Sequence, residues 1–301
     1  MKVDWLGSLF FIGALASALI ALTTYANGTT HIDVYIQQLY VPAIGLYLYL
    51  NTNFTIPLYS IALIGGVSAV LFVARELRAG QPLIDFHVFR TNSMFQSTNL
   101  SALFLYMSHF STLILLSFFL EEIQGVDPLM AGLLLTLEPL AVTVFAVIGG
   151  WITTRTGSRD PAIAGLGIVA ASLLLLSTIN QSSSTTFIAF LLVMLGAGVG
   201  IFAPSNTNAN LASVPPGDRA LANGILGMMR HTGQSLSLAI GTILIGLYLF
   251  GATSLGGGTF TPSQYIEAIN VNFILGAIMA GVGAIFAYRG REPARQAHEA
   301  I

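Results

Sequence analysis

The chain has 301 residues, of which 54% are hydrophobic, only 8% are charged and none is cysteine, and its formal net charge is −2. Soluble domains carry about 25% charged residues, so this composition excludes an ordinary water-soluble protein and predicts that the lipid bilayer is the main partner. The lack of cysteine excludes disulfides, thiol catalysis and thiolate metal sites. No cluster of basic residues indicates a nucleic-acid partner.

Eight apolar segments are long enough to cross a bilayer, which needs roughly 20 residues. They are approximately 5–24, 56–74, 97–120, 129–150, 161–179, 186–208, 221–249 and 270–288. The first segment is long for a signal peptide and precedes a poor cleavage site, so a retained helix is the favoured interpretation and a cleaved signal the alternative. The expected fold class is an all-α polytopic membrane protein with eight transmembrane helices.

Apart from Arg230 within the seventh segment, lysine and arginine occur only at alternate ends of these segments. The basic residues beside the segments are Lys2, Arg75, Arg78, Arg90, Arg155, Arg159, Arg219, Arg289, Arg291 and Arg295. The intervening connections, 25–55, 121–128, 180–185 and 250–269, contain neither residue type. Because basic connections stay on the cytoplasmic side, both termini are predicted to be cytoplasmic.

Two connections are longer than the others. Residues 25–55 are rich in tyrosine and β-branched residues and contain Pro42 and Gly45, which favours an extracellular β-hairpin or interfacial segment over a ninth span. Residues 79–95 form a cytoplasmic linker with an amphipathic pattern. The predicted organisation is a two-helix hairpin over 1–78, this linker, a six-helix bundle over 96–290 and a cytoplasmic tail over 291–301.

Small residues recur at a spacing of four in the last three spans. They are Gly196 and Gly200, then Gly233, Ser237 and Gly241, and finally Gly276, Ala280 and Ala284. Small residues at this spacing let helix backbones approach closely. Packing within one bundle is the main interpretation, and dimerisation is the alternative.

Residues 149–160 form a short hydrophilic connection between two apolar runs. The pattern Gly150-x-x-x-Thr154-Arg155-x-Gly157-x-Arg159 resembles the loop signature of the major facilitator superfamily. Further stretches resemble the fourteen-helix drug:proton antiporter branch of that superfamily. Among them are Asp4-Trp5-Leu6-Gly7, Pro82-Leu83-Ile84-Asp85, Gly196-x-Gly198-x-Gly200 and Arg230-x-x-Gly233-Gln234-Ser235. The matches run from about residue 4 to 290.

The resemblance implies a transporter of the plasma membrane that exports drug-like amphipathic compounds in exchange for protons. It aligns the chain with the two central helices and the C-terminal six, without the N-terminal bundle. A separate six-helix half or a second copy would then complete the substrate cavity. The alternative is a truncated or split half that serves only as an assembly partner, with no transport activity alone.

The signature departs from the family at two positions. The family's acidic residue is replaced by Thr154 and its final basic residue by Asp160. The resemblance assigns that acid to a latch between neighbouring helices. We therefore expect the latch to be weaker or built differently here.

Ionisable residues inside predicted spans are the leading candidates for proton coupling, because charge within the bilayer is costly. Glu138, near the middle of the fourth span and before Pro139, comes first, with a neutral hydrogen-bonded glutamic acid as the alternative. Arg230 could pair with an acid or extend toward the cytoplasmic surface, the favoured interpretation. His109 could titrate or be a structural histidine.

Three amides are candidates to line the transport pathway. They are Asn206, Asn210 and Gln234, and the two asparagines could instead be hydrogen-bonding groups near a helix end. The five histidines show no metal-ligand spacing, and no nucleophile is paired with a base. We therefore expect no enzyme, no metal and no cofactor.

Overall fold

The computed structural model describes residues 13, 17, 31–36, 39–41, 46–48, 52–76, 92–250 and 261–290. Most of the first predicted span, residues 79–91 of the linker and the tail 291–301 lie outside the described residues. The chain divides into two compact units, and each is described by itself.

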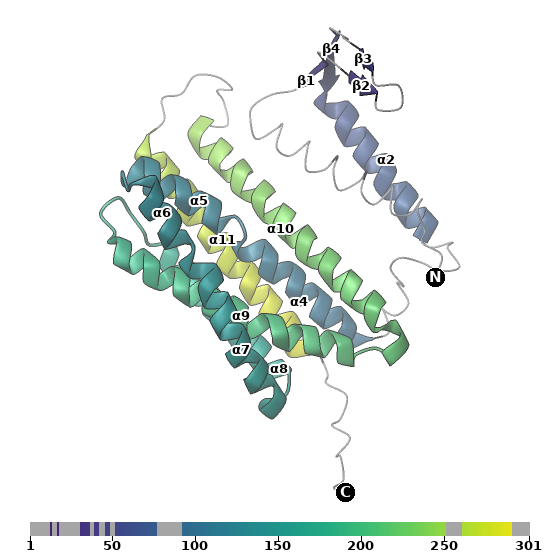
Figure 1. Cartoon of the computed structure of the whole chain (residues 1–301), viewed down its shortest axis with the longest axis vertical. Helices are drawn as coiled ribbons and strands as arrows, with labels where there is room; N and C mark the ends of the chain where they lie inside the picture. Colours follow the sequence, from purple (N-terminus) through teal and green to yellow (C-terminus); the bar gives the residue numbers. More distant parts are fainter. Residues whose placement is uncertain are drawn as a thin grey trace, which may run out of the picture. The chain divides into compact units, whose positions relative to one another are not determined.

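Among its described residues, the first unit contains antiparallel strands followed by a helix (Figure 1). Strand β1 (His31–Ile36) pairs with β4 (Thr52–Pro57), and β2 (Leu39–Val41) pairs with β3 (Leu46–Leu48). The β-branched and aromatic residues of this segment favour strands, so the predicted hairpin is confirmed. Helix α2 (Leu58–Glu76) follows directly. The extracellular position of the strands stays a prediction.

The second unit is helical. Its elements are α4 (Ser93–His109), α5 (Thr112–Phe118), the π-helix η1 (Phe119–Ile123), α6 (Pro128–Leu135), α7 (Leu137–Thr156), α8 (Arg159–Leu176), α9 (Thr185–Ala212), the 3-10 turn η2 (Pro216–Asp218), α10 (Arg219–Phe250) and α11 (Pro262–Arg289). The side chains of Asn92, Asp127 and Ser184 accept hydrogen bonds from backbone amides in the first turns of α4, α6 and α9. These caps set where the three helices begin.

Five helical segments among the described residues are long and apolar enough to cross a membrane. They are Ser93–Ile123, Pro128–Thr156, Arg159–Leu176, Thr185–Ala212 and Pro262–Arg289. Helix α10, with 32 residues, and α2, with 19, also correspond to predicted spans, since about 17 to 25 residues suffice. The chain is thus a multi-pass helical membrane protein, and the count of eight spans stays a prediction.

The structure corrects the predicted connection at 149–160. Helix α7 continues to Thr156 and α8 begins at Arg159, which leaves only Gly157 and Ser158 between them. Gly157 has φ 91°, a backbone region that residues with a Cβ rarely adopt. The sharp reversal at this glycine removes the need for a longer loop, so most of the signature is helical.

Helix α9 packs against both α7 and α8 through glycine (Figure 1). A methyl group added at Gly200 would lie 2.7 Å from the Val142 carbonyl oxygen of α7, and one at Gly198 would lie 2.7 Å from the Gly165 carbonyl oxygen of α8. Gly233 of α10 and Gly276 of α11 approach the α4 backbone in the same way. These contacts confirm that the small residues serve packing within one bundle.

The apolar core lies between α4, α5, α8, α9 and α11. Its largest fully buried side chains include Phe119, Phe202 and Phe273. By contrast, the span α6–α7 directs large apolar side chains outward, and Val147 is 75% exposed. Lipid is the medium in which such exposure is favourable.

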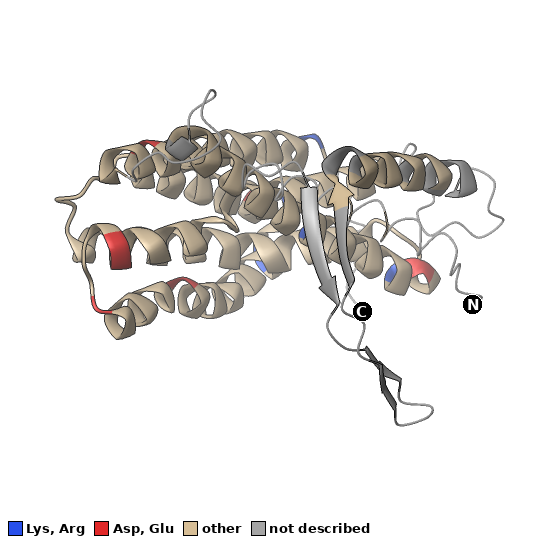
Figure 2. Cartoon of the chain, turned by 90° about the horizontal axis from the view of Figure 1, so that it is seen from above, with Lys and Arg blue, Asp and Glu red and all other residues tan. Residues whose placement is uncertain are grey.

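The arginines of the second unit lie away from one end of its helices, whereas acidic residues, Asp160 and Asp218 among them, lie toward both ends (Figure 2). Glu121 and Glu122 lie in η1, and Asp127 caps α6, so all three lie at the connection between these two helices. Arg155 and Arg289 lie in the last turns of α7 and α11, at the opposite end. This distribution of arginine agrees with the alternation of basic connections in the sequence, although the side of the membrane stays a prediction.

Candidate functional site

Glu138 lies at the break between α6 and α7, within the fourth predicted span. Helix α6 ends at Leu135 and α7 begins at Leu137, next to Pro139, which has no N–H to continue the helical hydrogen bonds. Glu138 is only 7% exposed and lies about three turns from the outer end of the span, by the predicted orientation. A carboxyl group is therefore buried well inside a membrane-spanning segment.

Arg230 joins three helices of the bundle. Its Nη2 donates a hydrogen bond of 2.6 Å to Thr207 Oγ1 of α9. Its guanidinium carbon lies 5.8 Å from the ring centroid of Tyr106 on α4, within the range of a cation–π contact. The side chain therefore ends on protein groups about three turns into α10.

Tyr106 contacts Arg230 and lies near enough to the buried carboxyl group for the charge of Glu138 to act on its phenol. Tyr106, Glu138, Thr207 and Arg230, here called the central cluster, come from α4, α7, α9 and α10. The sequence analysis found Glu138 and Arg230 but missed Tyr106 and Thr207, since an uncharged phenol or hydroxyl gives no signal in an apolar run.

His109 lies close to this cluster. It is 7% exposed, and its ring centroid lies 5.7 Å from that of Tyr106. Its Nδ1 donates a 2.8 Å hydrogen bond to the Leu105 carbonyl oxygen, which assigns the proton of the neutral ring to Nδ1. This bond gives His109 a structural role, and its titration during transport stays a prediction.

A second polar group supports the break between α4 and α5. The Ser111 amide donates to Ser237 Oγ of α10 over 3.0 Å. Asn272 Nδ2 of α11 donates to Ser111 Oγ over 3.1 Å. Backbone groups at a helix break need partners inside a membrane, and the neighbouring helices supply them. The helix break beside His109 is therefore held by two neighbouring helices, α10 and α11.

Gln234 lies one turn after Arg230 on α10. Its Oε1 accepts a 2.9 Å hydrogen bond from Nδ1 of His231, whose side chain is exposed. The amide NH2 of Gln234 is not used in that bond. Gln234 thus lies beside the central cluster, and its place in a pathway stays a prediction.

Asn206 and Asn210 bond neighbouring helices together. Asn210 Oδ1 accepts from Thr98 and Asn99 of α4, and its Nδ2 donates to the Ala222 carbonyl oxygen of α10, each over 3.0 Å. Asn206 accepts from Ser101 Oγ and donates to the Thr98 carbonyl oxygen, also over 3.0 Å. This geometry favours the helix-bonding interpretation.

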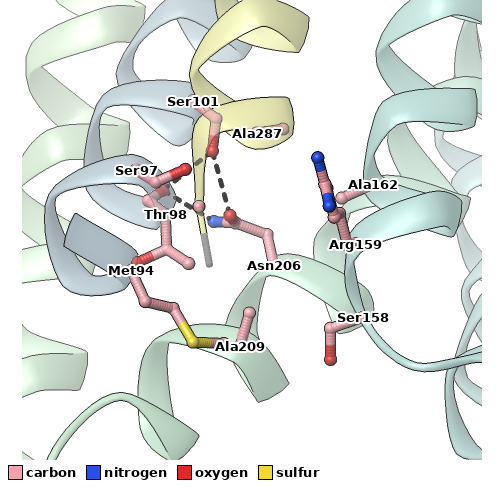
Figure 3. A pocket seen from close by; sticks show the side chains of 11 residues that line it. Met94, Ser97, Thr98, Ser101, Ser158, Arg159, Ala162, Asn206, Ala209 and Ala287 are labelled. Carbon is pink, nitrogen blue, oxygen red and sulfur yellow. Dashed lines mark hydrogen bonds between the residues drawn. The ribbon is translucent and has the colours of Figure 1, made fainter. Parts of the chain in front are cut away.

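Asn206 also lines a small pocket at the end of the bundle where α7 passes into α8. Figure 3 shows Ser97, Thr98 and Ser101 of α4 on one side of it and Arg159 of α8 on the other. The pocket lies at the predicted cytoplasmic end, apart from the central cluster.

The signature residues have different roles. Arg155 lies 4.0 Å from the ring centroid of Trp151 on its own helix. Arg159 Nη2 donates 2.6 Å to the Tyr288 carbonyl oxygen and lies over the Tyr288 ring. This places a positive charge at the carbonyl end of α11, where it is favourable. Gly150 has open space around it, whereas Gly149 touches the α9 backbone at Ile201.

The turn between α7 and α8 is attached to its neighbours without the family's acid. Within the described part of the chain, the Thr154 hydroxyl donates only to the Trp151 carbonyl oxygen of its own helix, and its side chain is exposed. The adjacent Thr153 forms a 2.6 Å hydrogen bond with Ser205 of α9. Thr153 and Arg159 therefore hold the turn against α9 and α11.

Most of the helical unit is matched by the model of a known protein family. The model of the Major Facilitator Superfamily matches residues 98–300. The chain belongs to this superfamily. Its members are membrane transporters and not enzymes.

Similar proteins include the riboflavin transporter RibZ of Clostridioides difficile, 27% identical over 218 residues, which are 72% of this chain and 46% of RibZ. The multidrug resistance protein Stp of Mycobacterium tuberculosis is 24% identical over 255 residues, with coverage of 79% and 46%. The chain spans about half the length of the curated relatives it matches.

Solved structures agree in fold. A bacterial homologue of the human lysosomal transporter Spinster, inward-facing and occupied, superposes with a TM-score of 0.53 at 15% identity, covering 77% of this chain and 57% of that one. The nucleoside transporter NupG gives 0.53 at 15%, with coverage of 78% and 60%. At this identity the likeness concerns the fold alone.

Proposed function

We propose that this chain is the cavity-forming C-terminal part of a proton-coupled exporter of drug-like amphipathic compounds in the plasma membrane, with both termini cytoplasmic. Membership of the superfamily and the similarity to multidrug resistance proteins support this proposal. The fourteen-helix drug:proton antiporter branch is the assignment that the sequence motifs favour. A second helical bundle, from a separate six-helix half or a second copy, completes the cavity.

The observation that carries the proposal is the burial of Glu138 within a membrane span, at a helix break, in the neighbourhood of Tyr106, which itself contacts Arg230. Protonation of the carboxyl group changes the net charge of the central cluster from about zero to about +1. A change of this kind alters the relative stability of two bundle arrangements, and alternating access requires such a change.

The test uses Glu138→Gln, which keeps the shape of the side chain but cannot exchange a proton. The full chain is expressed with and without an N-terminal six-helix half in cells lacking efflux pumps. Export of ethidium and of dansylglycine is measured in everted vesicles with an imposed pH gradient. We expect Glu138→Gln to lose gradient-driven export and to retain exchange of dye across the membrane.

Glu122→Gln is the matched control, because Glu122 is an exposed carboxylate at the end of the preceding span. It should leave gradient-driven export unchanged. Export that survives Glu138→Gln would remove Glu138 from proton coupling. If the wild-type chain exports neither dye, alone or with the six-helix half, the assembly-partner alternative is favoured instead.

A further inference from the structure

Arg230 is a cation inside helix α10. Most of the hydrogen-bond donors of its guanidinium are unused among the described residues. A guanidinium carries five N–H donors, and the bond to Thr207 uses one of them. Its Nε is buried and has no hydrogen-bond partner within the described part of the chain. An unpaired buried donor of a charged group is costly, so this arrangement favours an additional acceptor.

The described carboxylates do not supply that acceptor. Glu138 interacts electrostatically with Tyr106, but no ion pair between Glu138 and Arg230 is found among the described residues. The other groups around the guanidinium, the Tyr106 ring and the Thr207 hydroxyl, carry no formal negative charge. Within the described part of the chain, no negatively charged group therefore directly contacts Arg230.

Space and accessory donors are present beside Arg230. Gly227 lies one turn before it on the same face of α10, and a methyl group added there would meet no other atom within 4 Å among the described residues. Gln234 lies one turn after it, with an amide NH2 that is not used in its bond from His231. Arg230, Tyr106 and Thr207 are each only half-buried, so a small molecule can reach them.

We propose that Arg230 binds an anionic group of the transported compound, a carboxylate or a group of similar charge and shape. The fork of the guanidinium matches two carboxylate oxygens, and Gln234 provides a further donor beside it. Arg230 thereby selects anionic amphipathic substrates over neutral ones of equal size. This inference rests on the proposed transport function and names the substrate class of the same site.

The test compares two probes with the same fluorophore, dansylglycine, which is anionic at pH 7, and dansylglycinamide, which is neutral. Equilibrium binding to the purified full chain in detergent is followed by dansyl emission. We expect the wild-type chain to bind dansylglycine about 10- to 100-fold more tightly than the amide, the ratio expected for one charged hydrogen-bonded pair. Arg230→Gln should remove this preference, and Arg230→Lys should retain part of it.

Arg219→Gln is the control for net charge, because it removes an exposed arginine from the start of the same helix. It should leave the preference intact. Equal binding of both probes by the wild-type chain overturns the inference, as does a preference that survives Arg230→Gln or is lost equally in Arg219→Gln. If Arg230→Gln does not fold, the wild-type comparison and Arg230→Lys decide.

Binding and transport can fail separately. A wild-type preference for dansylglycine that depends on Arg230, without gradient-driven export of any dye, supports the anion site and contradicts the proposed transport function. Export that depends on Glu138, without any preference for the anionic probe, supports the proposed transport function and contradicts the anion site.

Discussion

Single residues of the signature show which chemistry the α7–α8 turn depends on. Gly157 permits the reversal through its positive φ, and Arg159 balances the carbonyl end of α11. Thr153, outside the family pattern, bonds to Ser205 of α9. The replacement of the family's acid by Thr154 therefore leaves a turn that is still fixed to two neighbouring helices.

Gly149 and Gly150 give a sharp prediction, because they are adjacent on one helix but face different surroundings. A methyl group at Gly149 would lie 2.7 Å from Ile201 Cα, whereas one at Gly150 would meet nothing within 4 Å among the described residues. We expect Gly149→Ala to destabilise the bundle by about 1 to 3 kcal/mol through overpacking. Gly150→Ala should be neutral or stabilising by up to about 1 kcal/mol, since alanine favours helix.

Thermal unfolding in detergent measures both variants. The expected order of melting temperatures is Gly149→Ala below wild type and Gly150→Ala at or above it. Equal effects of the two substitutions would show that the close approach of α7 and α9 at this position is not required for stability.

At the scale of elements, polar side chains hold apolar helices together where hydrophobic burial alone cannot align them. Asn210 bonds α9 to both α4 and α10, and Ser111 bonds the α4–α5 break to α10 and α11. Side chains in lipid gain little from mutual burial, so close glycine contacts and interhelical hydrogen bonds set the helix positions.

Asn210→Ala should loosen the junction of α4, α9 and α10. The substitution removes the side-chain donor to the Ala222 carbonyl oxygen and leaves Thr98 and Asn99 only their bonds to the Phe95 carbonyl oxygen, and the loss of these interhelical bonds costs about 1 to 3 kcal/mol. The exposed Asn208 on the same helix is the control, and Asn208→Ala should change the melting temperature little. A similar loss in both variants would argue against a specific role for the Asn210 bonds.

At the scale of the whole molecule, the distribution of arginine along the helices predicts the orientation in the membrane. The chain contains no cysteine, so single cysteines can be introduced without a background. In intact cells, a membrane-impermeant maleimide should label Gln181→Cys, between α8 and α9, and should leave Thr156→Cys, at the end of α7, unlabelled. Both positions are exposed. Labelling with the opposite pattern would invert the proposed topology.

The sequence by itself determined the class of the molecule. Low charge, apolar runs of spanning length and basic residues at alternate ends are properties that lipid imposes locally on each segment, so the helices could be predicted without coordinates. The family was indicated separately, by the resemblance of the 149–160 signature and the further motifs. Glu138 and Arg230 were found for the same reason, since a charge inside an apolar run is visible in one segment alone.

Only the tertiary structure decided what these residues contact. Tyr106 of α4 lies far along the chain from Thr207 of α9 and Arg230 of α10, and the meeting of the three side chains depends on glycine contacts and helix breaks that no single segment reveals. The same holds for Asn206 and Asn210, whose hydrogen bonds across helices favour a structural role over a pathway. Periodicity and hydropathy report how one segment is placed relative to lipid and water. A site is formed where several helices pack together, and the packing contacts between helices determine which side chains meet there.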